Sequence, residues 1–140
     1  AVISYARDFM IGRGFTYCVP PFMIRSDVVT GVMSFAEMDA MMYKIEGEDL
    51  YLIGTSEHSM IGKFIDTIIP EEELPKTLTS YSPCFRKEKG AHGIEERGVY
   101  RIHQFEKQEM IVVCHPDESK KWFDVLWQNT VDLFRSLCVP

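Results

Sequence analysis

Charged and aromatic side chains recur at every second position in two runs within 85–109, where they could build a binding site. Arg86 and Glu88 form the first alternating pair. The second series comprises Arg101, His103, Phe105, Lys107 and Glu109. Side chains two residues apart in a β-strand point to the same face of the sheet. If the two runs pair as neighbouring strands, two arginines, two glutamates and one aromatic ring can meet on one surface.

These residue types suit the recognition of ATP together with a small substrate that carries an amino group. An arginine fork binds phosphate through paired hydrogen bonds, and a phenylalanine ring can stack on a purine. A carboxylate can accept a hydrogen bond from the exocyclic amine of adenine or hold an ammonium group. The alternative is an ordinary solvent-exposed face with cross-strand ion pairs, each worth roughly 0.2–1 kcal/mol. By themselves, the residues give these two interpretations about equal weight.

A second candidate is the run Thr55-Ser56-Glu57, which lies between a predicted strand and a predicted helix. Thr55 has a side chain suited to an N-cap, and Glu57 would favour the positive end of the helix dipole. Taken alone, the run is therefore interpreted as a helix start rather than as a ligand site.

The composition argues against a protein that grips nucleic acid over its whole surface. The chain has 140 residues, of which 46% are hydrophobic, and its formal net charge is -6. That hydrophobic content is enough to bury a core, whereas general nucleic-acid binders are usually basic. Contact with RNA would have to run through a local patch or through a region outside these residues.

The cysteines indicate a reducing, cytoplasmic setting rather than a disulfide or zinc framework. Cys18, Cys84, Cys114 and Cys138 are widely spaced and form no CxxC pair, so we expect four reduced and mostly buried thiols. No apolar run is long enough to cross a membrane. The three glutamates at 71–73 are interpreted as a solvated loop, because nothing nearby in the sequence completes a set of metal ligands.

Helices and strands must position these groups. Apolar spacing predicts a first helix that ends at Gly12 and Gly14. Ser34 and Glu37 have the spacing of a capping box, and the methionines that follow are expected to fill the core rather than to bind a cofactor. We further expect strands at 15–19, 50–53, 77–88 and 99–114, a helix at 57–65, and loops at 70–75 and 89–98.

The last predicted element is an amphipathic helix that Asp117 or Ser119 could cap. Its apolar face would comprise Phe123, Leu126, Trp127, Thr130, Val131, Phe134 and Leu137. Long strands joined by a hairpin and flanked by helices predict an α+β fold with an antiparallel sheet. The sequence has no GxGxxG or Walker A pattern, so a nucleotide site would be of neither the Rossmann nor the P-loop kind.

The joint pattern resembles that of the class II aminoacyl-tRNA synthetases, and more narrowly that of their seryl members. The run SPCFRKE at 82–88, a loop, and RIHQFEKQE at 101–109 are similar to motif 2, which in seryl enzymes reads FRxE, loop, RxHQFxKxE. The TSE run at 55–57 resembles the serine-binding TxE element, and residues 1–21 resemble the latter part of motif 1, the usual dimer interface. The resemblance covers essentially the whole chain and implies an incomplete class II antiparallel sheet flanked by helices.

The resemblance implies that most of these residues bind ATP. Arg86 would contact the α-phosphate and the serine carboxylate, and Arg101 would hold the far end of the triphosphate. Glu88 would accept a hydrogen bond from the adenine amine, and Phe105 would stack on the adenine. The base would also rest on backbone groups of three consecutive residues, Ile102, His103 and Gln104.

Serine and tRNA account for the other implied contacts. Thr55, Glu57 and Glu109 would surround the ammonium and hydroxyl groups of serine. The side chain of His103 would be structural rather than a general base. The loop at 89–98 would lie near the acceptor end of the tRNA.

The implied function is that of a serine–tRNA ligase, homodimeric through motif 1 and cytoplasmic. It would activate L-serine with ATP, helped by Mg²⁺, and transfer the serine to tRNA(Ser). Motif 3 and the N-terminal tRNA-binding arm have no counterpart in these residues, so we expect 1–140 to be part of a catalytic domain, with little activity alone and a tendency to self-associate. Three alternatives stay open: a ligase that acts on a carrier protein, a non-catalytic synthetase paralogue, and a generic α+β interaction domain.

Overall fold

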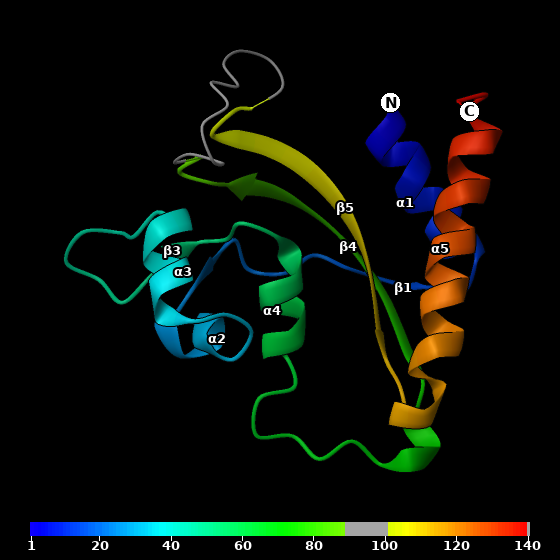
Figure 1. The fold of residues 1–140 in the computed structure, drawn as a ribbon, viewed down its shortest axis with the longest axis horizontal. Coiled ribbons are helices and arrows are strands. Elements are labelled where there is room, and N and C mark those ends of the chain that lie inside the picture. Colours follow the sequence, from blue (N-terminus) through cyan, green and yellow to red (C-terminus); the bar gives the residue numbers. More distant parts are fainter. Residues whose placement is uncertain (89–100, 140) are drawn as a thin grey trace. The chain divides into compact units, whose positions relative to one another are not determined.

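The computed structural model describes residues 1–88 and 101–139, and Figure 1 traces the chain. These residues form two compact units. The first unit comprises Ala1–Cys18, Thr67–Ser80 and Gln108–Pro140, and the second comprises Val19–Asp66 and Tyr81–Lys107. Among the described residues, no helix combines the length and the apolar character that crossing a membrane requires.

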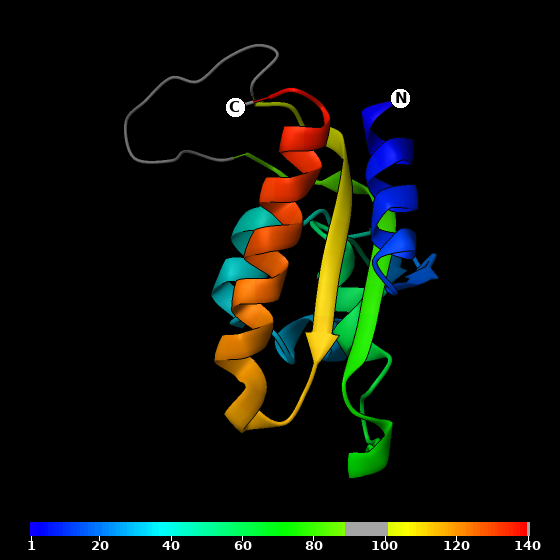
Figure 2. The ribbon, with the colours of Figure 1, turned by 90° about the vertical axis from the view of Figure 1, so that its right-hand side faces the viewer.

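Two helices dominate the first unit. Helix α1 (Val2–Gly12) and helix α5 (Ser119–Ser136) lie side by side, as Figures 1 and 2 show. The Arg13 guanidinium, just after α1, donates hydrogen bonds to Asn129 Oδ1 at 3.1 Å and to Asp132 Oδ2 at 2.9 Å. These contacts fasten the end of α1 to α5. Two short 3₁₀-helices, η1 (Glu71–Glu73) and η2 (Pro116–Glu118), belong to the same unit.

Three strands form the longer sheet, in the order β1-β4-β5. They are β1 (Thr16–Cys18), β4 (Lys76–Phe85) and β5 (Gln104–Val113). β4 and β5 run in opposite directions (Figure 1), whereas β1 runs parallel to β4 with Tyr17 opposite Thr79. The α+β class is confirmed, but the sheet is mixed rather than wholly antiparallel. A long connection between β1 and β4 permits the parallel pairing, which a short hairpin cannot make.

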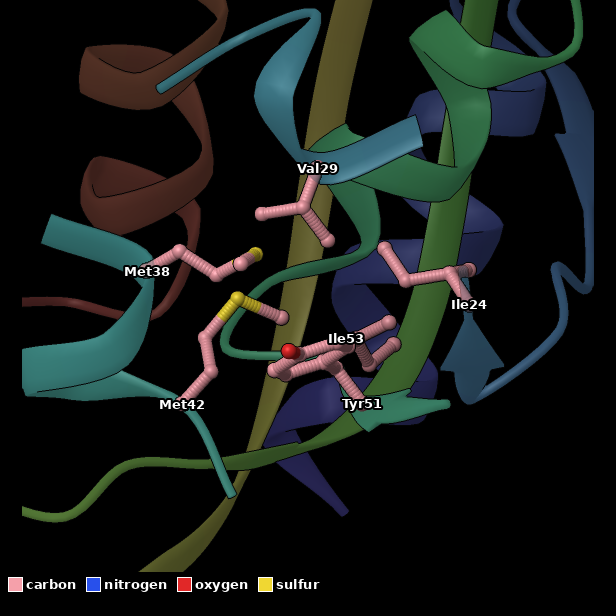
Figure 3. Packing of buried hydrophobic residues seen from close by; sticks show 6 residues of the cluster. All are labelled: Ile24, Val29, Met38, Met42, Tyr51 and Ile53. Atoms are coloured by element: carbon pink, nitrogen blue, oxygen red, sulfur yellow. The ribbon is translucent and has the colours of Figure 1, made fainter. Parts of the chain in front are cut away.

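The second unit is built around a compact apolar cluster. Its elements are β2 (Met23–Ile24), α2 (Ser26–Thr30), α3 (Phe35–Met41), β3 (Tyr51–Leu52) and α4 (Ser56–Gly62). Figure 3 shows the cluster, which comprises Ile24, Val29, Met38, Met42, Tyr51 and Ile53. The prediction that methionines fill the core is confirmed for Met38 and Met42, which are fully buried.

Both helix starts predicted from capping residues in the second unit are confirmed. The Ser34 hydroxyl accepts a hydrogen bond from the Glu37 backbone N–H, and the Glu37 carboxylate accepts one from the Ser34 N–H at 3.0 Å. The hydrogen bonds from Ser34 lower the pKa of the Glu37 carboxyl below its usual value. At the start of α4, Thr55 Oγ1 accepts a hydrogen bond from the Glu57 N–H at 3.4 Å.

The first unit differs from the predictions at two places. The glutamates at 71–73 are exposed, as predicted for a solvated loop, but they form the short 3₁₀-helix η1. Neither Asp117 nor Ser119 caps α5, because η2 leads the chain directly into the helix and Glu118 occupies the cap position without a side-chain cap.

The face of α5 that was predicted to be apolar and packed is partly open. Phe123 and Trp127 are each 64% exposed. Asn129 is the buried residue of the helix, and its side-chain oxygen is satisfied by the hydrogen bond from Arg13. The helix therefore packs through a face that is turned away from Phe123 and Trp127, whereas Trp122 is half-buried.

The two long strands are shorter than predicted, β4 at its C-terminal end and β5 at its N-terminal end. β4 ends at Phe85 and β5 begins at Gln104. Four predicted site residues therefore lie just outside the strands, namely Arg86, Glu88, Arg101 and His103. Their predicted alternation along one strand face is wrong, since Glu88 has a φ of 50° in the left-handed region and turns the chain. The loop predicted at 89–98 lies outside the described residues.

Candidate functional site

A pocket of about 190 Å³ lies in the second unit. Its lining comprises Ala40, Met41, Arg86, Glu88 and Arg101. The three charged residues are among those that the sequence predicts to bind ATP. The two apolar residues come from the C-terminal end of α3. The structure therefore brings the three charged residues, which follow β4 and precede β5, against α3.

Arg86 is held in place through both its backbone and its side chain. Its N–H donates to the carbonyl oxygen of His103 at 3.0 Å, and its Nε donates to the carbonyl oxygen of Gly54 at 3.0 Å. Its guanidinium carbon lies 5.3 Å from the centroid of the Phe105 ring, which is within cation–π range. The guanidinium of Arg86 is thus held between the Phe105 ring on β5 and the backbone of Gly54, which precedes Thr55.

Glu88 and Arg101 form an ion pair at the wall of the pocket, between a carboxylate oxygen and Arg101 Nη1. The side chain of Glu88 is 15% exposed and that of Arg101 is 32% exposed. Both side chains therefore keep some contact with solvent at the pocket. A ligand phosphate in the pocket could replace the carboxylate as the partner of Arg101, because phosphate also accepts charge-assisted hydrogen bonds from a guanidinium.

The TSE run lies beside β5. Thr55 is buried, and in addition to capping α4 it accepts a hydrogen bond from Lys107 Nζ at 3.4 Å. Glu57 is exposed in the first turn of α4. The cap interpretation of Thr55 is confirmed, and its hydroxyl also contacts an ammonium group from the strand that carries Phe105.

The other predicted residues lie as follows. Glu109 belongs to the first unit, where its carbonyl oxygen accepts a hydrogen bond from Thr79 Oγ1 at 2.7 Å, and its contact with serine stays a prediction. Ile102 is exposed, and Gln104 opens β5 with an exposed side chain. His103 Nδ1 lies 2.7 Å from the Tyr43 hydroxyl, in agreement with a structural role for this ring.

His58 is a titratable group close to the site to which the sequence assigned no role. It is 4% exposed, and within the described residues its Nδ1 has no hydrogen-bond partner. Burial, and then the positive charges of Arg86 and Lys107, lower the pKa of the imidazole below its ordinary value of 6.5. The ring is therefore mainly neutral at pH 7 and adds no charge to a site that already holds two cations.

Sequence reasoning missed three kinds of residue at this site. Ala40 and Met41 carry no signal, because apolar residues at the end of a helix are ordinarily interpreted as core. His58 carries none either, since its burial depends on packing. From the sequence, Lys107 was placed on the same strand face as Phe105 but was assigned no contact. Its place in that alternating series was the signal that could have marked Lys107 as a site residue.

Neither metal ligation nor cysteine chemistry marks the site. Within residues 1–88 and 101–139, no group of three His, Cys, Asp or Glu residues could hold a metal ion. All four cysteines are free thiols. Only Cys84 is fully buried, so the expectation of mostly buried thiols is wrong: Cys18 and Cys114 are half-buried and Cys138 is exposed.

Similarity to known proteins covers the whole chain. It is 45% identical over 140 residues to the serine–tRNA ligase of Picrophilus torridus and 42% identical to that of Archaeoglobus fulgidus. The structure superposes with a TM-score of 0.90 on seryl-tRNA synthetase from Pyrococcus horikoshii, which was solved in complex with ATP; the match has 41% identity and covers 96% of this chain and 30% of that one. The chain spans 32% and 31% of the two sequence relatives, about a third of their length.

A family model identifies the fold family independently of single relatives. Residues 41–140 match the model described as the tRNA synthetase class II core domain (G, H, P, S and T). This match spans well over half of the chain and includes every pocket residue except Ala40. The chain therefore belongs to the family of class II tRNA synthetase core domains.

Proposed function

We propose that this chain forms the ATP- and serine-binding part of a serine–tRNA ligase. The observation that carries the proposal is the pocket where Arg86, Glu88 and Arg101 meet, with the Phe105 ring beside the Arg86 guanidinium. Relatives named serine–tRNA ligase at 41–45% identity support it. The ATP complex of the similar Pyrococcus horikoshii enzyme supports the same ligand.

The proposed reaction has two steps. An oxygen of the serine carboxylate attacks the α-phosphorus of ATP, the bond to the bridging oxygen of the β-phosphate breaks, and seryl-adenylate and pyrophosphate form. A terminal ribose hydroxyl of tRNA(Ser) then attacks the acyl carbonyl, and AMP leaves. Positioning of the reactants and neutralisation of charge on phosphorus account for the rate of such a reaction. A pocket with two arginines suits that demand.

Arg86 is the residue best placed to act on both substrates. Its Nε contacts the Gly54 carbonyl, next to Thr55, while its guanidinium lies over the Phe105 ring. From this position it can contact the α-phosphate while adenine stacks on Phe105 and serine binds near Thr55. Binding of the triphosphate would draw Arg101 from Glu88 and leave the Glu88 carboxylate for the adenine amine.

Serine recognition is proposed for Thr55, Glu57 and Glu109, which would bind its ammonium and hydroxyl groups. A site that hydrogen-bonds a substrate hydroxyl rejects the analogue without it, because the buried polar groups of the site would be left unpaired. Alanine should therefore be a very poor substrate.

The remaining parts of the proposal are Mg²⁺, the homodimer and the cytoplasmic location. Mg²⁺ ordinarily binds ATP through the phosphates with few protein ligands. The part of the chain that the structure describes has no three-ligand group for it, so the ion would be held chiefly by the phosphates. Residues 1–21 would form the homodimer contact.

The first test is calorimetric titration of ATP into the chain, with Arg86→Ala as the variant and Arg25→Ala as the matched control. Arg25 forms an exposed ion pair with Asp27 in the same unit and does not line the pocket. We expect Arg86→Ala to weaken binding at least about tenfold, since a charge-assisted contact to phosphate is lost. Arg25→Ala should bind like the parent. Equal affinities for all three chains would contradict the proposed site.

Serine activation is tested in a chimera in which these residues replace the equivalent third of a full-length relative. Exchange of pyrophosphate into ATP should require serine, should fail with alanine, and should fall about 10²–10³-fold in Arg86→Ala. Exchange without charging of tRNA(Ser) would favour a ligase for a carrier protein. ATP binding without exchange for any amino acid would favour a non-catalytic paralogue.

A further inference from the structure

The segment 39–43, at the C-terminal end of α3 and just beyond it, lies against the pocket. Ala40 and Met41 line the pocket together with the three charged residues. The terminal methyl group of Met41 would lie 3.5 Å from a Cβ atom placed on Gly54, the residue whose carbonyl binds Arg86. The segment therefore contributes the two apolar residues of a lining whose other three residues are charged.

Backbone carbonyls of the same segment bind the residue that follows Arg86. The Lys87 N–H donates to the Met41 carbonyl oxygen at 2.8 Å, and Lys87 Nζ donates to the Asp39 carbonyl oxygen at 2.6 Å. The last carbonyls of a helix lack partners within the helix and carry partial negative charge. Lys87 satisfies two carbonyls at the end of α3, so the helix end and the chain beyond β4 are joined directly.

Tyr43 makes the third contact, and it reaches Arg86 through His103. His103 Nδ1 lies 2.7 Å from the Tyr43 hydroxyl and 3.1 Å from the Arg86 carbonyl oxygen. A carbonyl oxygen can only accept, so the tautomer with a hydrogen on Nδ1 serves both oxygens at once. Together with the bond from the Arg86 N–H to the His103 carbonyl, this binds the Arg86 backbone on both its donor and its acceptor side.

We propose that the segment 39–43 is the second wall of the nucleotide site and that Tyr43 is a positioning residue, which acts through the His103 ring on Arg86. The inference rests on the proposed function of the pocket. The strand β4 ends at Phe85. The hydrogen bonds between Arg86 and His103 extend the pairing with the chain before β5 by one residue, and that residue carries the guanidinium proposed to bind phosphate. Without the Tyr43 hydroxyl the imidazole loses a partner that fixes its orientation, and Arg86 gains freedom that ATP must then remove.

The decisive variant is Tyr43→Phe, which removes one oxygen and keeps the ring. The edge-on packing of this ring on His103, with centroids 6.2 Å apart, and the backbone bond from Leu52 to the Tyr43 carbonyl should remain. Tyr81→Phe is the matched control, because its hydroxyl also takes part in a side-chain hydrogen bond, which it donates to Glu106 at 2.6 Å, and it does not line the pocket. Each chain is measured for thermal unfolding, for amide hydrogen exchange and for ATP affinity.

We expect Tyr43→Phe to raise the exchange rate of the Arg86 amide and the Kd for ATP, each by about fivefold, as the loss of one hydrogen bond implies. The unfolding midpoint should stay close to that of the parent, and the Phe85 amide, which bonds to Ile53, should serve as an unchanged internal reference. Tyr81→Phe should alter neither Arg86 exchange nor the Kd. A purely structural role would lower the midpoint and affect the Phe85 and Arg86 amides alike.

A second pair of variants tests the route through His103. In a His103→Phe background Tyr43→Phe should have no further effect, whereas His103→Asn should restore most of the Arg86 protection, because its amide N–H can replace Nδ1–H. An unchanged Arg86 amide in Tyr43→Phe, or additive effects of the two phenylalanine substitutions, would overturn the inference. If the parent chain binds no ATP, the proposed function fails instead, and the exchange data still decide whether Tyr43 positions Arg86.

Discussion

The imidazole of His58 illustrates how a single residue can depend on the charges around it. It is buried on α4, and it feels the positive charges of Arg86, just beyond β4, and of Lys107 on β5. Its pKa is lowered in the folded chain, so the unfolded chain binds the extra proton more readily between the folded pKa and 6.5. The contribution of the neutral His58 to the free energy of unfolding is therefore fully present above pH 6.5. It is lost as the pH falls from 6.5 toward the lowered pKa of the folded chain.

A substitution at this residue should weaken the pH dependence. We expect His58→Asn to reduce the fall in unfolding midpoint between about pH 7 and pH 5, because the group that must be protonated against burial and two cations is gone. His115→Asn is the control, since His115 is an exposed residue of the first unit. Thermal melts over this pH range check the prediction, and parallel curves for the parent and His58→Asn would refute it.

At the scale of elements, α3 contributes more to the site than its length suggests. It spans seven residues, which is too short for a helix to be stable by itself. Its first turn is held by the capping box of Ser34 and Glu37, and its last carbonyls bind Lys87. The helix therefore depends on both of its ends, and its C-terminal end lines the pocket.

Loss of the cap should destabilise the second unit. We expect Ser34→Ala to lower the free energy of unfolding by about 1 kcal/mol, the usual cost of losing an N-cap oxygen. Ser119→Ala is the matched control, because Ser119 stands at the start of α5 without making a cap hydrogen bond, and its effect should stay within about 0.5 kcal/mol. Urea melts of both variants provide the comparison. Similar losses from the two substitutions would show that the cap of α3 is not special.

At the scale of the whole molecule, apolar surface in the first unit is the notable feature. On α5 the exposed large side chains are Phe123, Trp127 and Phe134, and on α1 they are Val2, Tyr5 and Ile11. Exposed apolar patches of this kind favour association. The expectation that the chain associates with itself, drawn first from the sequence, acquires a specific surface here.

Association through α5 predicts a concentration-dependent sedimentation coefficient for the parent chain. We expect Trp127→Ser to shift sedimentation toward the monomer, since Trp127 is 64% exposed and contributes a large apolar area. Ile68→Ser is the control, because Ile68 is 95% exposed but lies outside the helices. If both variants sediment like the parent, α5 is not the contact surface.

The sequence was most informative where structure is decided by near neighbours. The capping box at Ser34, the cap at Thr55 and the strand residues around Phe105 were predictable, because hydrogen bonds over a few residues and alternation decide them. The predictions of strand direction and strand ends failed, because contacts with segments far away in the sequence decide them. β1 pairs parallel to β4, and the strands stop before Arg86 and Arg101.

By itself, then, the sequence determined the residue types of the site, their order and the local elements that carry them. Only the tertiary structure decided which of them meet. It placed Met41 and Tyr43 against the Arg86 segment, paired Glu88 with Arg101, and brought Lys107 to Thr55. Such contacts join residues that are far apart in the chain, and they depend on how the elements pack, which no short sequence pattern encodes.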